Sequence, residues 1–256
     1  MSGSGGRPGR ASAGADTLPV PVAVFASGGG SNLQALLDAE RDPESVSGTA
    51  EAPWRIVLVV SDRPDAGALE RARAAGRETR VILVSGRDPE EVSDETLDAL
   101  AGAKVRAVFL AGYLRLLPVA LVQSFRRRIL NIHPSLLPAF GGKGMYGTRV
   151  HQAVLDSGGR VSGATVHFVD EEYDAGTILA QWPVPVLPGD EAATLAARML
   201  RVEHLLYPAA ARHVCRALAA GREPTPFAPT GDVFVAAAGI PDGELYRQIN
   251  EAFGSQ

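Results

Sequence analysis

The sequence predicts an α/β protein built as a three-layer sandwich, with a mostly parallel central sheet between two layers of helices. Short apolar runs of buried-strand character alternate with helical stretches over the first half of the chain. A cluster of glycines separates the first run from the first helical stretch, as in a tight strand-to-helix turn. After residue 126 loops rich in proline and glycine interrupt the alternation, and we expect the sheet to become mixed toward the C-terminal half.

The first half of the chain begins with the strand PVAVFA at 21–26. The segment SNLQALLDA follows the glycines, and its Leu33, Leu36 and Leu37 lie at helical spacing. Further strands are expected at 55–61, 80–84 and 106–112, and further helices at 66–76 and 88–101. Parallel strands need crossover connections, so this order places helices on both faces of the sheet.

The second half of the chain is expected to add three strands, one short helix and one long helix. The strands are expected at 126–133, 162–170 and 177–186, the short helix at 147–158 and the closing helix at 190–221. Pro183 and Pro185 remove backbone donors from the last strand, which indicates an edge position. Pro208 lies inside the closing helix and is expected to kink it or to split it in two.

The chain is expected to divide into a leader, one domain and a tail. Residues 1–19 are expected to form a disordered leader. The domain covers 20–221, with halves at about 20–125 and 126–221. Residues 222–256 are first rich in proline and then contain DGELYRQINEAF, which predicts a short amphipathic helix.

Composition argues against several classes of partner. The formal net charge is −4 and no long run of Lys or Arg occurs, so a nucleic-acid partner is not expected. The single cysteine, Cys215, excludes an internal disulfide, and no cluster of Cys and His predicts a metal site. No run reaches the roughly 18 apolar residues of a membrane span, and the N-terminus lacks the apolar core of a signal peptide. We therefore expect a cytoplasmic protein without a membrane partner.

The turn ASGGGSN joins the first expected strand to the first expected helix. Gly28, Gly29 and Gly30 let backbone amides approach an anion, and the helix that starts at Ser31 adds its dipole. The spacing is not that of the dinucleotide fingerprint, so a single phosphate is the favoured ligand. The alternative is a turn whose glycines serve only to close the strand onto the helix.

An amide and an imidazole stand together in the segment ILNIHP. Asn131 and His133 alternate along a strand, so both side chains project from one face at its C-terminal end, where open α/β sheets bind ligands. Asp174 lies in a later loop that ends at Gly176. An acid beside a histidine holds it protonated, and a protonated imidazole with an amide can stabilise an oxyanion. The alternative for His133 is a hydrogen-bonded residue of the core.

The other polar candidates have simpler interpretations. His167 alternates within a strand and is expected to pack in the core, whereas His151 and His213 are expected on helix surfaces. Glu203 and His204 precede LLYP on the closing helix, where they either reach a ligand or lie on a solvated face.

Two loops complete the list of candidate binding segments. The segment GYLRLLP leaves the fourth strand and suits one wall of a flat apolar pocket. The acidic pair Glu171 and Glu172 is most simply part of a solvated loop.

Five motifs follow one another along the chain: SGGGSN, AGYLRLLP, NIHPSLLP, GATVHFVDEEYDAG and EHLLYP. In this order they resemble the folate-dependent formyltransferase family, in particular its phosphoribosylglycinamide formyltransferases, over about residues 22–221. The resemblance implies a Rossmann-like first half that binds a nucleotide and a second half that helps to form a folate cleft. It also implies transfer of a formyl group from 10-formyltetrahydrofolate to the amine of glycinamide ribonucleotide (GAR) in purine synthesis.

The resemblance implies a role for each residue that matches the family's motifs. The catalytic trio would be Asn131, His133 and Asp174. The residues that bind GAR would be Gly30, Ser31, Asn32 and Glu203. The residues that bind formyl folate would be Leu114, Arg115, Leu116, Leu117, Asp170, Glu171, Glu172 and Tyr173.

The chemistry of formyl transfer gives the trio its implied roles. Asn131 and protonated His133 would stabilise the charge that develops on the formyl oxygen when the amine of GAR attacks. Asp174 would keep the imidazole charged and help to move a proton toward the departing folate nitrogen. Neither a metal nor a covalent nucleophile is required.

Two segments depart from the family's pattern. The loop from residue 139 to 154 is longer and richer in glycine than the corresponding stretch of the family. Arg87 matches the family's folate-contacting arginine only loosely, so that role is not assigned to it.

Related enzymes share the Asn, His and Asp arrangement and provide alternatives. Formyltransferases that act on methionyl-tRNA usually have a basic C-terminal domain, and the hydrolase that releases formate from the same folate has a regulatory N-terminal domain. Neither feature is evident in this sequence, so GAR is the expected acceptor; a sugar-nucleotide formyltransferase and a non-catalytic nucleotide- or folate-binding protein are further alternatives. A monomer and a homodimer are equally compatible with the sequence.

Overall fold

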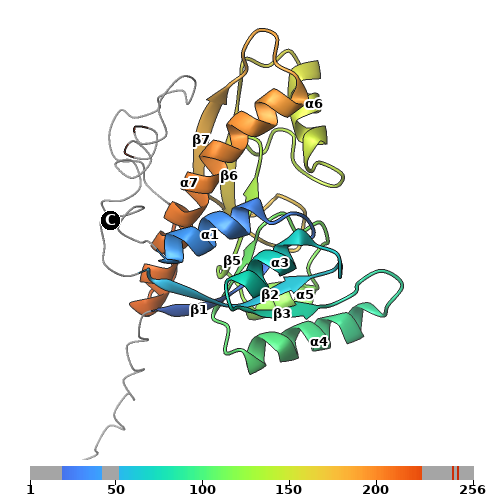
Figure 1. Ribbon diagram of the computed structural model, residues 1–256, viewed down its shortest axis with the longest axis vertical. Helices are drawn as coiled ribbons and strands as arrows, with labels where there is room; N and C mark the ends of the chain where they lie inside the picture. Colours follow the sequence, from blue (N-terminus) through green and yellow to red (C-terminus); the bar gives the residue numbers. More distant parts are fainter. Residues whose placement is uncertain (1–18, 42–51, 227–243, 245–246, 248–256) are drawn as a thin grey trace, which may run out of the picture.

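A computed structural model describes residues 19–41 and 52–226 together with residues 244 and 247. The described chain forms one seven-stranded sheet in the order β3-β2-β1-β4-β5-β6-β7 (Figure 1). The expected leader, apart from its last residue, and the expected helix of the tail, apart from those two isolated positions, lie outside the described residues.

The strands and helices lie close to their expected positions. The strands are β1 (Val20–Phe25), β2 (Trp54–Ser61), β3 (Glu78–Val81), β4 (Ala107–Leu110), β5 (Ile129–His133), β6 (Val161–Phe168) and β7 (Ile178–Pro185). The helices are α1 (Ser31–Arg41), α3 (Gly67–Ala74), α4 (Pro89–Gly102), α5 (Val119–Ser124), α6 (Thr148–Asp156) and α7 (Ala192–Ala219). Of these, the sequence pattern did not predict α5.

The sheet is parallel in its first half and antiparallel in its second, as the sequence predicts. The strands β1 to β5 pair in parallel, whereas β6 pairs antiparallel with both β5 and β7. The strand β7 lies at the edge of the sheet, where Pro183 and Pro185 cause no loss in the ladder.

Two apolar cores lie on opposite faces of the sheet and make the three layers. Alternate residues of β1 serve different cores, because Val22 and Val24 pack with α1, α3 and α7 while Ala23 and Phe25 pack with α4 and α5. Figure 1 shows α1 and α7 together on one side and α4 on the other. Burial of both faces explains why the parallel strands are continuous apolar runs.

The closing helix α7 is continuous, which corrects the expectation that Pro208 would split it. The flanking turns are held by burial, since Leu206, Tyr207 and Ala210 are fully inaccessible to solvent. The Tyr207 hydroxyl contacts the carbonyl oxygens of Leu110 and Leu130, at 2.9 and 3.1 Å, and so ties the helix to the ends of β4 and β5. Packing of this extent outweighs the one helical hydrogen bond that a proline removes.

Candidate active site

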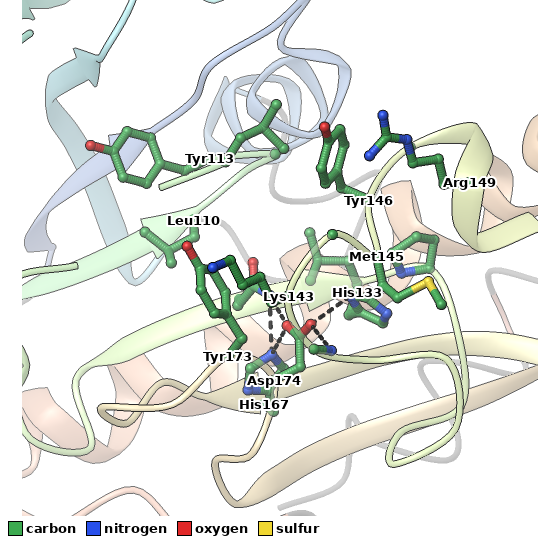
Figure 2. A pocket seen from close by; sticks show the side chains of 18 of the residues that line it. Leu110, Tyr113, His133, Lys143, Met145, Tyr146, Arg149, His167, Tyr173 and Asp174 are labelled. Atoms are coloured by element: carbon green, nitrogen blue, oxygen red, sulfur yellow. Dashed lines mark hydrogen bonds and ion pairs between the residues drawn. The ribbon is translucent and has the colours of Figure 1, made fainter. Parts of the chain in front are cut away.

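Asn131, His133 and Asp174 meet at the C-terminal end of β5. Asn131 and His133 share one face of that strand, and Asp174 reaches them from the loop between β6 and β7. Figure 2 shows the contacts of the Asp174 carboxylate with His133 and His167. His133 Nδ1 lies 3.5 Å from Asp174 Oδ2, and Asn131 Nδ2 donates to Asp174 Oδ1 at 3.4 Å. The structure therefore brings the three predicted residues together.

The loop that follows β5 contacts both ionisable members of this trio. The Gly142 backbone N–H donates to Asp174 Oδ2 at 2.9 Å. His133 Nε2 lies 2.9 Å from the carbonyl oxygen of Phe140, so this nitrogen carries the proton and donates. Both ring nitrogens of His133 thus face acceptors, an arrangement that only the doubly protonated ring satisfies completely.

His167 belongs to the same cluster, although the sequence favours core packing for it. It stands opposite Asn131 in the β5–β6 ladder, and its Nε2 lies 3.0 Å from Asn131 Nδ2 and 3.6 Å from Asp174 Oδ1. Its Nδ1 donates to the Phe168 carbonyl oxygen at 2.9 Å, and its Nε2 faces both the Asn131 amide and the Asp174 carboxylate. The ring is buried and also lines the pocket, so it fixes the orientation of Asn131.

Tight packing of glycines determines where the loop between β6 and β7 places Asp174. A Cβ atom on Gly176 would lie 1.8 Å from the Phe168 carbonyl oxygen, which no side chain can tolerate. Asp174 itself has φ 55°, a left-handed conformation that Asp adopts more readily than most residues. The sequence signal for this arrangement is the pairing of the acid with a glycine two residues later.

Burial and charge act in opposite directions on the trio. Burial lowers the pKa of His133, while the Asp174 carboxylate and the Phe140 carbonyl raise it, and the net direction is downward. Burial raises the pKa of Asp174, but its hydrogen bonding with His167, the charge of His133 and the Gly142 N–H together bring that pKa below the ordinary value. Asp174 is therefore a carboxylate that favours the protonated form of His133, as expected from the sequence, while burial of the ring opposes this effect.

Glu203 and Asn32 form a buried pair at another part of the same pocket. Asn32 Nδ2 donates to Glu203 Oε2 at 2.7 Å, and the Asn32 Oδ1 atom is buried without a partner among the described residues. Burial raises the pKa of Glu203 to about 7, against the opposing effect of the Asn32 hydrogen bond. A solvated helix face, one of the two interpretations from sequence, is therefore excluded for Glu203.

The glycine turn has a packing role that the sequence could not distinguish from anion binding. Gly30 has φ 74°, and a Cβ atom there would lie 2.8 Å from Ala68 of α3. Gly28 and Gly29 have open space around them, so packing does not require glycine at either position. Ser31 is the first residue of α1, and of the predicted GAR residues only Asn32 and Glu203 line the pocket.

A pocket of about 560 Å³ connects these groups, a volume typical of sites for small ligands. The predicted folate residues that line it are Leu114, Arg115, Leu116, Leu117, Glu172 and Tyr173. Asp170 and Glu171 are not among its lining residues. Asp170 instead accepts a hydrogen bond from the Glu172 N–H at 3.0 Å, which closes a turn, and Glu171 is exposed, as expected for a solvated loop.

The pocket also contains residues that the sequence did not single out. The glycine-rich loop after β5 supplies Lys143, Met145 and Tyr146, which Figure 2 shows around the same pocket as His133 and Asp174. His151 was expected on a helix surface, but its ring is 4% exposed and lines the pocket. Its only sequence signal is its position between Val150 and Val154, whose spacing marks the buried face of α6.

Neither a metal cluster nor a membrane-spanning helix is found in the described part of the chain. No group of three or more His, Cys, Asp or Glu side chains there has the arrangement needed to hold a metal ion. No helix among the described residues is long and apolar enough to cross a bilayer.

Comparison with known proteins identifies the family. The model of the family described as formyl transferase matches residues 20–211, which include every residue of the trio. The chain belongs to the formyl transferase family. The match spans both halves of the sheet, so the pocket lies wholly within the formyl transferase domain.

Named relatives of this formyl transferase include one from a plant and one from a bacterium. It is 48% identical to a chloroplastic phosphoribosylglycinamide formyltransferase of Arabidopsis thaliana over 196 residues, which are 76% of this chain and 65% of that protein. It is 39% identical to phosphoribosylglycinamide formyltransferase of Escherichia coli, over 73% of this chain and 83% of that protein. The chain thus spans slightly less than two thirds of the plant relative and most of the bacterial one.

A solved structure supports the same family and fold. The glycinamide ribonucleotide transformylase 1 of Symbiobacterium toebii superposes with a TM-score of 0.70 at 38% identity, covering 80% of this chain and 90% of that one. The α/β fold with its mixed sheet is therefore that of the family.

Proposed function

We propose that this protein transfers the formyl group of 10-formyltetrahydrofolate to the amine of GAR, giving formyl-GAR and tetrahydrofolate. The observation that carries the proposal is the convergence of Asn131, His133 and Asp174 in one pocket with the buried Asn32–Glu203 pair. The pocket has polar groups for an amine-bearing substrate and an apolar wall for a flat ring. The names of the relatives support the same reaction.

The donors of the trio suit the charge that the reaction develops. The amine nitrogen forms a bond to the formyl carbon, the bond from that carbon to the folate nitrogen breaks, and one amine proton ends on the folate nitrogen. Asn131 Nδ2 and His133 Nδ1, whose contacts with Asp174 are long at 3.4 and 3.5 Å, donate instead to the formyl oxygen in the tetrahedral intermediate. Negative charge on that oxygen favours the imidazolium form, which offsets the effect of burial on His133.

Asp174 serves as the acceptor that organises the proton transfer. Its carboxylate faces His133, Asn131 and the Gly142 N–H at once, so it stays charged while the amine loses its proton. A water molecule beside the carboxylate can carry that proton to the folate nitrogen. No metal ion and no covalent enzyme intermediate enter this scheme.

The two substrates occupy different parts of the pocket. GAR places its amine near Asn32 and Glu203, and its phosphate lies at the turn of Gly30 and Ser31, where the N-terminus of α1 attracts anions. Formyl folate lies against Leu114, Leu116 and Tyr173, which present partly exposed apolar surface to the pocket. We place the activity in the cytoplasm, in a monomer or homodimer, with these small molecules as the partners.

An assay with and without GAR tests this proposal. The purified protein is expected to convert 10-formyltetrahydrofolate to tetrahydrofolate, with the accompanying change in absorbance, only when GAR is present. Formate release that does not depend on GAR would instead identify a hydrolase. No folate turnover with GAR, despite binding of both ligands, would identify a non-catalytic binding protein.

A further inference from the structure

His151 is a buried polar group that the proposed chemistry leaves unused. It belongs to the second turn of α6, its ring is 4% exposed, and it lines the pocket. Its Nδ1 atom is inaccessible to solvent and has no hydrogen-bond partner among the described residues. An unsatisfied buried nitrogen costs about 1–3 kcal/mol, and a ligand satisfies Nδ1 only when the ring turns that nitrogen toward the pocket that His151 lines.

His151 lies on a helix that packs beside the part of the pocket proposed to bind the acceptor substrate, GAR. The helix α6 packs against α7, and α7 supplies Leu200 and Glu203 to the lining. Glu203 in turn is bonded to Asn32 of α1. The residues of the apolar folate wall come from a different part of the fold, the segment after β4.

The surroundings of His151 favour an uncharged ring. Burial lowers its pKa, and any positive charge on His133 lowers it further. A neutral imidazole presents one N–H donor and one acceptor nitrogen. It therefore matches a neutral polar group, such as a sugar hydroxyl or an amide, better than it matches a phosphate.

We propose that His151 binds the acceptor substrate, and that its imidazole forms a hydrogen bond with the uncharged polar part of GAR between the phosphate and the amine. The inference rests on the proposed function for the identity of the acceptor. It adds a substrate-contacting residue on α6 to the Asn32–Glu203 pair, so that groups from α1, α6 and α7 hold one ligand.

Replacement of His151 tests the proposal through the affinity for each substrate separately. His151→Leu keeps an apolar side chain in the core but removes both nitrogens. Its dissociation constant for GAR, measured by calorimetry without folate, is expected to rise about tenfold, as the loss of one hydrogen bond to a ligand predicts. The KM for 10-formyltetrahydrofolate and the melting temperature are expected to stay close to the wild-type values.

Two conservative variants show which ring nitrogen of His151 bonds to GAR. They also distinguish a lost hydrogen bond from a folding defect. His151→Asn places a polar atom near the position of Nδ1, and His151→Gln places one near Nε2, so one of them is expected to recover part of the GAR affinity. Gln152→Ala, on the exposed face of the same helix, is the matched control and is expected to bind GAR as the wild type does.

Specific outcomes would overturn the inference. Unchanged GAR affinity in His151→Leu would show that the ring does not contact GAR. An equal rise of both KM values with a lowered melting temperature in all three His151 variants would show a structural role only. In either case GAR-dependent turnover by the wild-type protein would leave the proposed function standing, so the two hypotheses fail separately.

Discussion

Side chains of one pocket are held in different protonation states by their local surroundings. Asp174 accepts the Gly142 N–H and faces two imidazoles, so it keeps its charge despite burial. Glu203 is fully buried and accepts a hydrogen bond from Asn32. This one bond does not offset the effect of burial, so the pKa of Glu203 lies above its ordinary range. A carboxyl group with a pKa near neutral does not force a neighbouring amine to stay an ammonium ion. It can therefore bind a substrate amine in the neutral form that acts as a nucleophile.

The raised pKa of Glu203 makes a prediction for stability. Its pKa rises from an ordinary value of 4.5 to about 7 on folding, so the folded state binds the proton more tightly. The free energy of unfolding therefore falls as pH rises from about 4.5 to about 7, by on the order of 3 kcal/mol for this group alone. Glu203→Gln removes this loss, because the amide resembles the protonated acid.

Urea unfolding at several pH values between 5 and 8 measures this effect. The stability of Glu203→Gln relative to wild type is expected to increase with pH and to level off above neutral pH. The comparison cancels the titration of all other groups, including Asp174. Parallel pH profiles for the two proteins would show that burial does not raise the pKa of Glu203.

Among the structural elements, the loop between β6 and β7 has the strictest requirement for its sequence. Gly176→Ala would place a Cβ atom 1.8 Å from a backbone carbonyl oxygen, so the loop must move and carry Asp174 with it. We expect a loss of about 1–3 kcal/mol of stability, as overpacking costs, together with most of the formyl-transfer activity. Chemical unfolding and the GAR-dependent assay measure the two effects.

Gly102→Ala is the matched control for this substitution. Gly102 ends α4, has no atom within 4 Å of the added Cβ and has no positive φ. Alanine there is expected to leave activity unchanged and to stabilise the helix by up to about 1 kcal/mol. Equal behaviour of the two variants would contradict the role assigned to the packing around Gly176.

The segment after β4, whose residues Leu114 to Leu117 we propose as the folate wall, is tied to the end of β2 by an ion pair. Arg115 Nε lies 2.7 Å from Asp62 Oδ2, and the Asp62 side chain is 2% exposed. Asp62→Asn keeps the shape but weakens this tie by about 1 kcal/mol, so we expect the KM for formyl folate to rise about fivefold. GAR affinity should not change.

Arg63→Ala provides the control for the ion pair, because Arg63 pairs with Asp65 on the exposed surface next to Asp62. Steady-state kinetics with each substrate varied in turn distinguish the two variants. The KM for formyl folate could be unchanged in Asp62→Asn or raised equally in Arg63→Ala. Either result would show that Asp62 does not position the segment after β4.

The elements that the sequence predicted are those with strong periodicity, and the missed features depend on tertiary contacts. Buried strands such as β1 and β2 are apolar runs between loops, so their positions follow from local pattern. The helix α5 has six residues and gives too short a pattern to recognise. The pocket role of His151 depends on the contact between α6 and α7, which a local pattern does not contain.

At the scale of the whole molecule, the mixed sheet is what assembles the site. Parallel strands alone bring the ends of β1, β4 and β5 to one edge, where the glycine turn, the proposed folate wall and His133 lie. The antiparallel β6 places His167 opposite Asn131, and its connection to β7 returns Asp174 to the same edge. The trio was predictable because its motifs were recognisable, whereas the contribution of His167 follows from strand register.

The most direct test of the account is the GAR-dependent turnover number of His133→Ala at saturating concentrations of both substrates. Removal of a donor to the formyl oxygen is expected to lower this rate by on the order of a hundredfold to a thousandfold, with GAR binding and the melting temperature preserved. Wild-type turnover by a folded His133→Ala variant would contradict the assignment of the Asn131, His133 and Asp174 cluster as the catalytic centre.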